Sequence, residues 1–595
     1  MTQVQGEVML LKPPMSLGVH CGADAHLLWY LLRIHMENNY EHLQLSVGHE
    51  SLFGSRISQE ELIDIISRYP ATLWLDLFSK IEGFLIIPRG KDFNAHEFLA
   101  DNLFCPSAIE RTRRKANVGN VYFSLGQLNL LRKLAILYGN DTNQTEIEKI
   151  DISKVLLAAQ DIHNAYDESV GKGSTEDFFK FVIRNGYLNG NTDSSTLFFR
   201  ARKIYIEQSR KLPIYPQKSF NEFFKEKVGL TPEESIALNF ALVNPFFLPK
   251  ETLFGQTAIL PKDYFGQTTI DSGQITSIID SMTTDFAAIK ADLLTELGGK
   301  ELSTIPAGYD LSIFRKTPLI KLPLDRLVCG NLSCLLEKST QNIIWMAIKN
   351  TDEKDRGTLI NDLTSYRGRL FEEYLKELCS IMTEKNKKLS FAHIPPDATT
   401  DHEEVGDSIL IQGNKLVIFE AKSRQFLESF KATGDWEKDP RFIAEFIKAA
   451  EQIETAITKI RSGVVTDLNI NAALIEKIYP VIVTYESIPM YGKVQRLIRQ
   501  KVSEAGHLVD PMFAPLEVVT IADIEQVIDS VNTVTLIDLL SAKNSGDPHA
   551  SESNLHNFFA WYLSVNTVIC NGWQRGQVDK TFDEVFYPFF KDKFK

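Results

Sequence analysis

A short stretch with the pattern of a β-hairpin constrains the fold of this chain more than any other part of the sequence. Residues 403–422 read EEVGDSILIQGNKLVIFEAK, which is two largely apolar runs joined by Gly413 and Asn414. A Gly-Asn pair between such runs suits a two-residue turn with positive φ. If this pair forms the turn, Gln412 faces Lys415, and the register of every cross-strand pair follows from that one match.

Counting outward from the turn places Asp407 directly opposite Glu420. Side chains at directly opposed positions have Cβ atoms roughly 4.5–5.5 Å apart on one face of the sheet. Period-two alternation puts Lys422 on the same face. The apolar residues divide between both faces, with Ile409, Ile411, Leu416 and Ile418 beside the charged groups and Leu410, Val417 and Phe419 behind them. The hairpin is therefore expected to lie buried between two layers.

Two carboxylates and a lysine at one end of a buried sheet are costly unless another group compensates their charge. A hard divalent cation does so, because Mg²⁺ takes oxygen ligands and is commonly held by one or two carboxylates. The hairpin thus predicts a cation site at the end that carries Asp407, Glu420 and Lys422. The alternative is a surface hairpin with solvated charges, which the two apolar faces disfavour.

The pattern Asp407, twelve residues, then Glu420-Ala421-Lys422 on adjacent strands resembles the PD-(D/E)XK nuclease superfamily. Gly406 stands where a proline usually precedes the aspartate, and this departure removes no ligand. The flanking segments carry the rest of the resemblance.

Upstream, Ser365 to Met382 predicts a helix with one apolar stripe, made of Phe371, Tyr374, Leu375, Leu378 and Ile381. The superfamily often has such a helix, with a glutamate after an aromatic residue, and here that residue is Glu372. Helical geometry places Glu372 beside the stripe and Glu373 nearly opposite it, facing solvent.

Downstream, Arg441 to Arg461 predicts a long amphipathic helix, and Lys477 to Tyr485 and Pro515 to Ile521 predict two further strands. Helix, three strands, helix, two strands is the order of this superfamily. The resemblance covers roughly Leu363 to Leu540 and implies an α/β/α domain similar to restriction endonucleases.

The resemblance also implies roles for individual residues. Asp407 and Glu420 would hold Mg²⁺ or Mn²⁺, with the Ala421 carbonyl as a further oxygen ligand and Glu372 holding a water or a second ion. Lys422 would orient the attacking water and offset the negative charge of the transition state. A lysine beside two carboxylates stays protonated, which favours this role over that of a general base.

Contacts to nucleic acid are expected from one polar and several basic side chains near the motif. Gln452 occupies a position where some superfamily members carry a site glutamine, although Ala456 replaces their tyrosine. Phosphate contacts, which position a nucleic acid without reading its sequence, are expected from Arg367, Arg369, Arg424, Lys431 and Arg441.

The length of 595 residues allows several domains. The fold expected is α+β and multidomain, with a large helical N-terminal region before the nuclease-like domain. The predicted parts are a mainly helical region at 1–305 with an internal break near 141–195, a small strand–helix bridging module at 306–350, the nuclease-like domain at 351–545, and a linker with an aromatic-rich helical tail at 546–595.

Charge and cysteine content limit the kind of protein and the compartment that are expected. The net charge of −13 argues against a protein that coats nucleic acid non-specifically, although it permits a local basic channel. Six scattered cysteines fit a reducing cytoplasm, and neither a secretory signal nor an apolar run of membrane-spanning length is expected.

Three functional interpretations remain. The first is a Mg²⁺-dependent endonuclease acting on DNA, in restriction, repair or anti-phage defence, working with an ATPase or targeting subunit or as a homo-oligomer. The second is a nuclease fold that binds nucleic acid or assembles a complex without catalysis. The third is a helical interaction protein in which the motif at 403–422 is coincidental. Mg²⁺-dependent cleavage of DNA distinguishes the first from the others.

Overall fold

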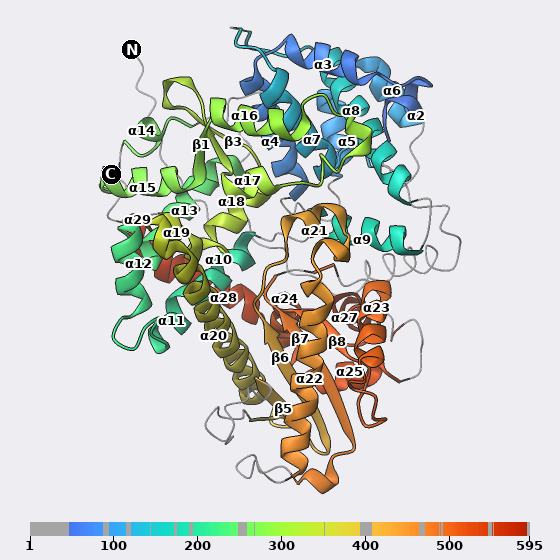
Figure 1. Ribbon diagram of the computed structural model, residues 1–595, viewed down its shortest axis with the longest axis vertical. Coiled ribbons are helices and arrows are strands. Elements are labelled where there is room, and N and C mark those ends of the chain that lie inside the picture. Colours follow the sequence, from blue (N-terminus) through green and yellow to red (C-terminus); the bar gives the residue numbers. More distant parts are fainter. Residues whose placement is uncertain are drawn as a thin grey trace.

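The structure is a computed structural model of the chain. It describes residues 47–86, 94–114, 121–142, 144–171, 175–189, 194–247, 259–266, 268–349, 351–392, 407–462, 471–486, 488–489, 492–545, 550 and 553–591. Residue Gly406 lies outside these ranges. Within them the protein is α+β as expected, mostly helical with two small mixed sheets (Figure 1).

Helices dominate the first half of the described chain. They are α2 (His49–Phe53), α3 (Gln59–Ser67), α4 (Ala71–Ile86), α5 (Ala95–Leu103), α6 (Pro106–Arg114), α7 (Leu125–Tyr138), α8 (Lys149–Gly171), α9 (Thr175–Asn189), α10 (Ser194–Arg202), a π-helix at Lys203–Gln208, α11 (Ser209–Lys211), α12 (Phe220–Val228), α13 (Pro232–Phe247), α14 (Pro261–Tyr264), α15 (Ser272–Met282) and α16 (Phe286–Leu297). Ser58 is the N-cap of α3, because its side chain accepts a hydrogen bond from the Glu61 N–H.

A small three-stranded sheet follows, in the order β1 (Thr283–Asp285), β2 (Leu319–Lys321) and β3 (Leu327–Cys329). The last two of these strands lie in the predicted bridging module, with helices α17 (Ser312–Lys316), α18 (Leu332–Ser339) and α19 (Met346–Lys349) around them.

The second sheet carries the predicted hairpin. Its order is β4 (Ser390–Ala392), β5 (Ser408–Gln412), β6 (Lys415–Lys422), β7 (Lys477–Thr484) and β8 (Glu517–Thr520). Strand β5 runs antiparallel to both β4 and β6, whereas β6, β7 and β8 run parallel to one another. The 33-residue helix α20 (Glu353–Lys385) precedes these strands, and α22 (Arg441–Arg461) connects β6 to β7.

The hairpin register is confirmed from the turn as far as Ser408 and Phe419. Gln412 pairs with Lys415 and Ser408 pairs with Phe419, so the turn falls on the two residues expected. Gly413 has a φ of 61°, a left-handed conformation that glycine adopts without a steric cost.

Helices cover both faces of this sheet, as the two apolar faces of the hairpin require. Leu410, Val417 and Phe419 pack with α20 in one core, whereas Ile409 and Ile418 pack with α22 in another. Figure 1 shows α20 and α22 flanking β5 and β6 in the lower part of the molecule. Further helices complete these layers, namely α21 (Glu428–Thr433), α23 (Gly492–Glu504), α24 (Ile521–Ser530) and α25 (Leu536–Lys543).

The cores run across the predicted domain boundaries. One core joins residues of α10, α12 and α13 to α20, to the sheet and to the C-terminal helices α27 (Leu555–Val565), α28 (Trp573–Thr581) and α29 (Tyr587–Lys591). A separate core holds α3, α4, α7 and α8 together with α16. The aromatic tail therefore docks on its own chain, and packing does not divide the protein at residue 305 or 350.

Among the described residues, no helix is both long enough and apolar enough to cross a membrane.

Candidate functional site

The predicted pair of carboxylates meets at the end of β5 and β6. Asp407 immediately precedes β5, and its N–H donates at 3.0 Å to the carbonyl of Phe419, the residue that pairs with Ser408. The strand pairing runs as far as Ser408 and Phe419, so the predicted pairing of Asp407 with Glu420 is not part of it, although the two carboxylates lie close enough to influence each other. The Ala421 N–H donates to Asp407 Oδ2 at 2.6 Å. Glu420 is only 4% exposed, whereas Asp407 is half-buried.

Burial and mutual repulsion perturb this pair. Removal from water raises the pKa of Asp407, and the neighbouring charge of Glu420 raises it further, to about 8. The Ala421 N–H and the charges of Lys422 and Lys376 act in the opposite direction without offsetting the rise. The positive charges and N–H groups around Asp407 therefore do not balance its burial and the repulsion from Glu420.

Lys422 lies within the same cluster. Its ammonium Nζ is 2.8 Å from Glu420 Oε1 and 2.7 Å from Gln452 Oε1. Gln452 comes from α22 and is 8% exposed. The structure thus brings together Asp407, Glu420, Lys422 and Gln452, from the hairpin and from the helix that covers its charged face.

Glu372 is placed differently. It lies half-buried on α20, whose Lys376 is close enough to influence Asp407. Within the described ranges, no group of three His, Cys, Asp or Glu side chains is arranged to hold a metal ion, and the role of Glu372 at the site stays a prediction. Glu373, expected to be solvated, is instead half-buried and paired with Lys376, with 2.8 Å between Oε1 and Nζ.

Two of the basic residues expected to contact phosphate are buried. Arg367 is 2% exposed, and its guanidinium lies over the rings of Trp345 and Tyr485, at 5.1 and 5.9 Å from the centroids. Lys431 is 5% exposed and forms ion pairs with Glu428 and Glu486. Both predictions of a surface contact are wrong in this conformation, because tertiary packing covers side chains that sequence position alone left open.

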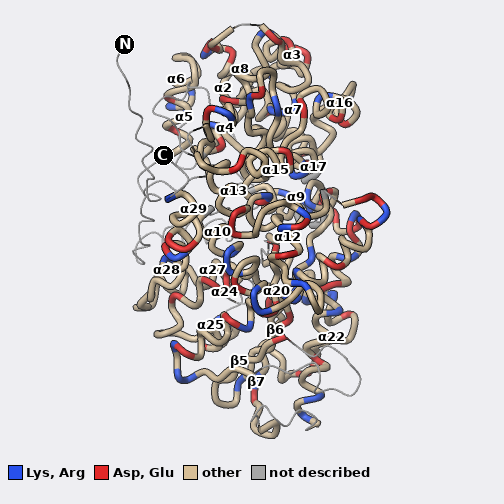
Figure 2. The backbone as a smooth tube through the Cα atoms, turned by 90° about the vertical axis from the view of Figure 1, so that its left-hand side faces the viewer, with Lys and Arg blue, Asp and Glu red and all other residues tan. Residues whose placement is uncertain are grey.

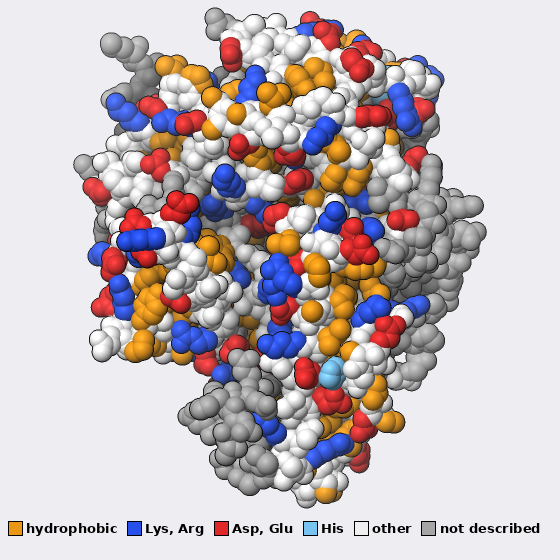
Figure 3. Space-filling model, viewed as in Figure 1, with side chains coloured by type: hydrophobic (Ala, Val, Ile, Leu, Met, Phe, Trp, Pro, Cys, Tyr) orange, Lys and Arg blue, Asp and Glu red, His pale blue; other side chains and the backbone are white. Residues whose placement is uncertain are grey.

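The other arginines reach the surface. Arg424 forms an ion pair with Glu445, Arg441 is held by Asp439 at 2.8 Å, and Arg369 is exposed beside the ring of Tyr366. Figure 3 shows Lys and Arg side chains over the strip of surface between α20 and α22. In Figure 2 acidic and basic residues are interspersed along the visible elements.

The sequence reasoning missed two residues near the site. Lys376 lies one helical turn after Glu372, a spacing that could have indicated its position. Tyr485 follows β7, and its N–H donates to the Lys422 carbonyl at 3.0 Å. No local sequence signal marks Tyr485, because its contact with Lys422 depends on how β6 pairs with β7. Along the chain, 55 positions separate Lys422, at the end of β6, from Lys477, at the start of β7.

Comparison with protein-family models, with curated proteins and with solved structures finds no match to this chain.

Proposed function

We propose that the protein is a metal-dependent nuclease that hydrolyses phosphodiester bonds, with DNA as its substrate. The observation that carries this proposal is the closeness of Asp407 and Glu420 at one end of the hairpin, where burial and the charge of Glu420 raise the pKa of Asp407 to about 8. Two clustered carboxylates that repel each other are what a divalent cation stabilises. The choice of DNA rests on the resemblance to PD-(D/E)XK nucleases.

The donor set fits Mg²⁺ or Mn²⁺, which prefer oxygen ligands. Asp407 and Glu420 would hold the ion, and the Ala421 carbonyl is available as a further oxygen. When bound, such an ion supplies Lewis-acid stabilisation of the charge that develops on the phosphate.

Side chains of the cluster position the attacking water and stabilise the transition state. Lys422 orients the attacking water and offsets negative charge as it builds on the phosphoryl oxygens. Gln452 fixes the position of the ammonium through the contact of 2.7 Å, which lowers the freedom that a long lysine side chain would otherwise have. Arg369, Arg424 and Arg441 are the surface residues proposed to contact the nucleic-acid backbone.

One observation favours a second candidate, a catalytically silent nuclease-fold module that binds nucleic acid or assembles a complex. The ammonium of Lys422 already has partners in Glu420 and Gln452, so the lysine could serve as a structural counter-charge.

Single-turnover cleavage of labelled duplex and single-stranded DNA, with Mg²⁺ or with EDTA, separates the two. A nuclease cleaves with Mg²⁺ and not with EDTA. Lys422→Met then loses about 10²–10³ in rate while DNA binding in Ca²⁺ is retained. Lys422→Arg does not restore the rate, because a planar guanidinium cannot take the place of a compact ammonium. DNA binding without cleavage by the wild type would instead support the silent module.

A further inference from the structure

The carboxyl ends of β6 and β7 are attached to a distant part of the chain. Residues 341–342, in the connection between α18 and α19, touch both strand exits. The Asn342 Oδ1 accepts a hydrogen bond from Gln425 Nε2 at 2.6 Å, three residues beyond Lys422. The Gln341 carbonyl lies 3.4 Å from the hydroxyl of Tyr485, the residue that follows β7.

Tyr485 links this attachment to Lys422. Its backbone N–H pairs with the Lys422 carbonyl at 3.0 Å, so the position of Tyr485 fixes where β6 ends. Its side chain projects to the opposite face of the sheet, is 2% exposed and packs edge-on against Phe371 at 5.4 Å between centroids.

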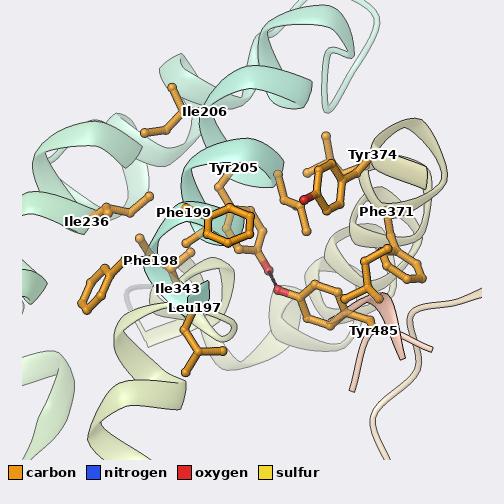
Figure 4. Close-up of a cluster of buried hydrophobic side chains, with 14 of the residues drawn as sticks. Leu197, Phe198, Phe199, Tyr205, Ile206, Ile236, Ile343, Phe371, Tyr374 and Tyr485 are labelled. Atoms are coloured by element: carbon orange, nitrogen blue, oxygen red, sulfur yellow. Dashed lines mark hydrogen bonds between the residues drawn. The ribbon is translucent and has the colours of Figure 1, made fainter. Parts of the chain in front are cut away.

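The N-terminal region supplies the last contact. Tyr205 donates its hydroxyl hydrogen to the Gln341 carbonyl at 2.8 Å and lies 3.4 Å from the Tyr485 hydroxyl, the contact drawn as a dashed line in Figure 4. Tyr205 is fully buried and belongs to the π-helix Lys203–Gln208. π-Helical turns within α-helices occur frequently at functional sites.

Neighbours on the π-helix hold Tyr205 in place. Lys203 Nζ lies 2.8 Å from Glu377 of α20, and Gln208 also donates to Glu377. Buried hydroxyls are costly to leave without partners, so the Tyr205, Gln341 and Tyr485 contacts form one connected unit.

We propose that Tyr205 and Tyr485 are positioning residues for Lys422, through which the N-terminal helical region sets the geometry of the candidate catalytic edge. This inference rests on the proposed nuclease function. Neither tyrosine touches the predicted site with its side chain; each acts by fixing the end of the strand that carries the ammonium.

The test compares Tyr205→Phe, Tyr485→Phe and the double variant with Tyr479→Phe in the full-length chain. Tyr479 is a matched control, because it lies on β7 and on the same face, is 5% exposed, and has its hydroxyl 2.7 Å from Ser541 Oγ at the other end of the strand. All three single variants lose one buried hydroxyl and should lower the melting temperature by similar amounts.

The cleavage rate should distinguish Tyr205→Phe and Tyr485→Phe from the control Tyr479→Phe. Single-turnover rates fall about tenfold in Tyr205→Phe and Tyr485→Phe, with DNA binding in Ca²⁺ unchanged, since small displacements of a catalytic group are costly. The double variant is no slower than the slower single variant, because both act through one contact. Tyr479→Phe keeps the wild-type rate. A wild-type rate in Tyr205→Phe, or an equal loss in Tyr479→Phe, overturns the proposal.

Hydrogen–deuterium exchange gives a readout that needs no activity. The amide of Tyr485 should exchange faster in Tyr205→Phe and remain protected in Tyr479→Phe. If the wild type does not cleave DNA, the nuclease proposal fails, and faster exchange would still support the attachment of the strand end. Unchanged exchange at Tyr485 overturns the positioning role whatever the activity.

Discussion

Metal binding at the carboxylate pair should release nearly one proton at neutral pH. The pKa of Asp407 is raised to about 8, first by burial and then by Glu420. With that pKa roughly 90% of the Asp407 side chains carry a proton at pH 7, and roughly 99% at pH 6. A cation binds the ionised carboxylate, so binding must displace this proton.

The expected magnitude follows from the same pKa. Between pH 8 and pH 6 the affinity for Mn²⁺ should weaken about 50-fold, approaching tenfold per pH unit well below the pKa. An aspartate with the ordinary pKa of 3.8 would be ionised throughout this range and would give no such dependence.

Isothermal titration of Mn²⁺ in buffers with different ionisation enthalpies measures both quantities. At pH 7 we expect about 0.9 proton released per ion bound. Asp538→Asn serves as the control, because Asp538 contacts Gln412 near the turn end of the same hairpin, and its replacement should leave the proton count unchanged. Equal affinities at pH 6 and pH 8, with no proton released, would refute the argument that Asp407 and Glu420 form an under-compensated pair.

Three further outcomes are expected. In EDTA the folded protein keeps a proton on Asp407 that the unfolded chain releases above about pH 4, so wild-type stability falls as pH rises from about 4 to about 8. Asp407→Asn should therefore match the wild type near pH 4 and, because Asp407 is only partly screened from solvent, exceed it by about 2 kcal/mol at pH 8 in calorimetric melts. Equal pH dependence in both proteins would contradict this. Glu420→Ala should abolish cleavage without lowering the melting temperature in EDTA above about pH 8, where Asp407 is ionised and the variant removes one of two repelling charges; a large loss of stability there would make Glu420 structural. Glu525→Gln should cost about 3–5 kcal/mol in unfolding experiments, because it leaves the buried guanidinium of Arg200 without its bidentate partner. Replacing Arg200 and Glu525 together by methionine should recover most of the stability lost in Glu525→Gln. If the double variant is no more stable, the loss comes from altered packing and not from the unpaired charge.

The sequence by itself determined the local geometry of the hairpin. A Gly-Asn pair between two apolar runs fixes the turn, and the turn fixes the register from Gln412 and Lys415 to Ser408 and Phe419, which leaves Asp407 and Glu420 at the same end of the hairpin. These are short-range consequences of backbone conformation and of side-chain alternation, so one chain suffices to read them. The same holds for the amphipathic helix that carries Gln452, whose spacing predicts which side faces the sheet.

Tertiary structure decided what surrounds that hairpin. Arg367 and Lys431 are basic residues close to the motif in sequence, yet packing against Trp345 and pairing with Glu428 remove them from the surface. Tyr205 and Tyr485 meet although 280 positions separate them. Such contacts depend on how whole elements pack, and burial of apolar surface, which drives that packing, is not directional along the chain. The sequence thus determines a local pair of carboxylates, and the fold decides which distant side chains control it.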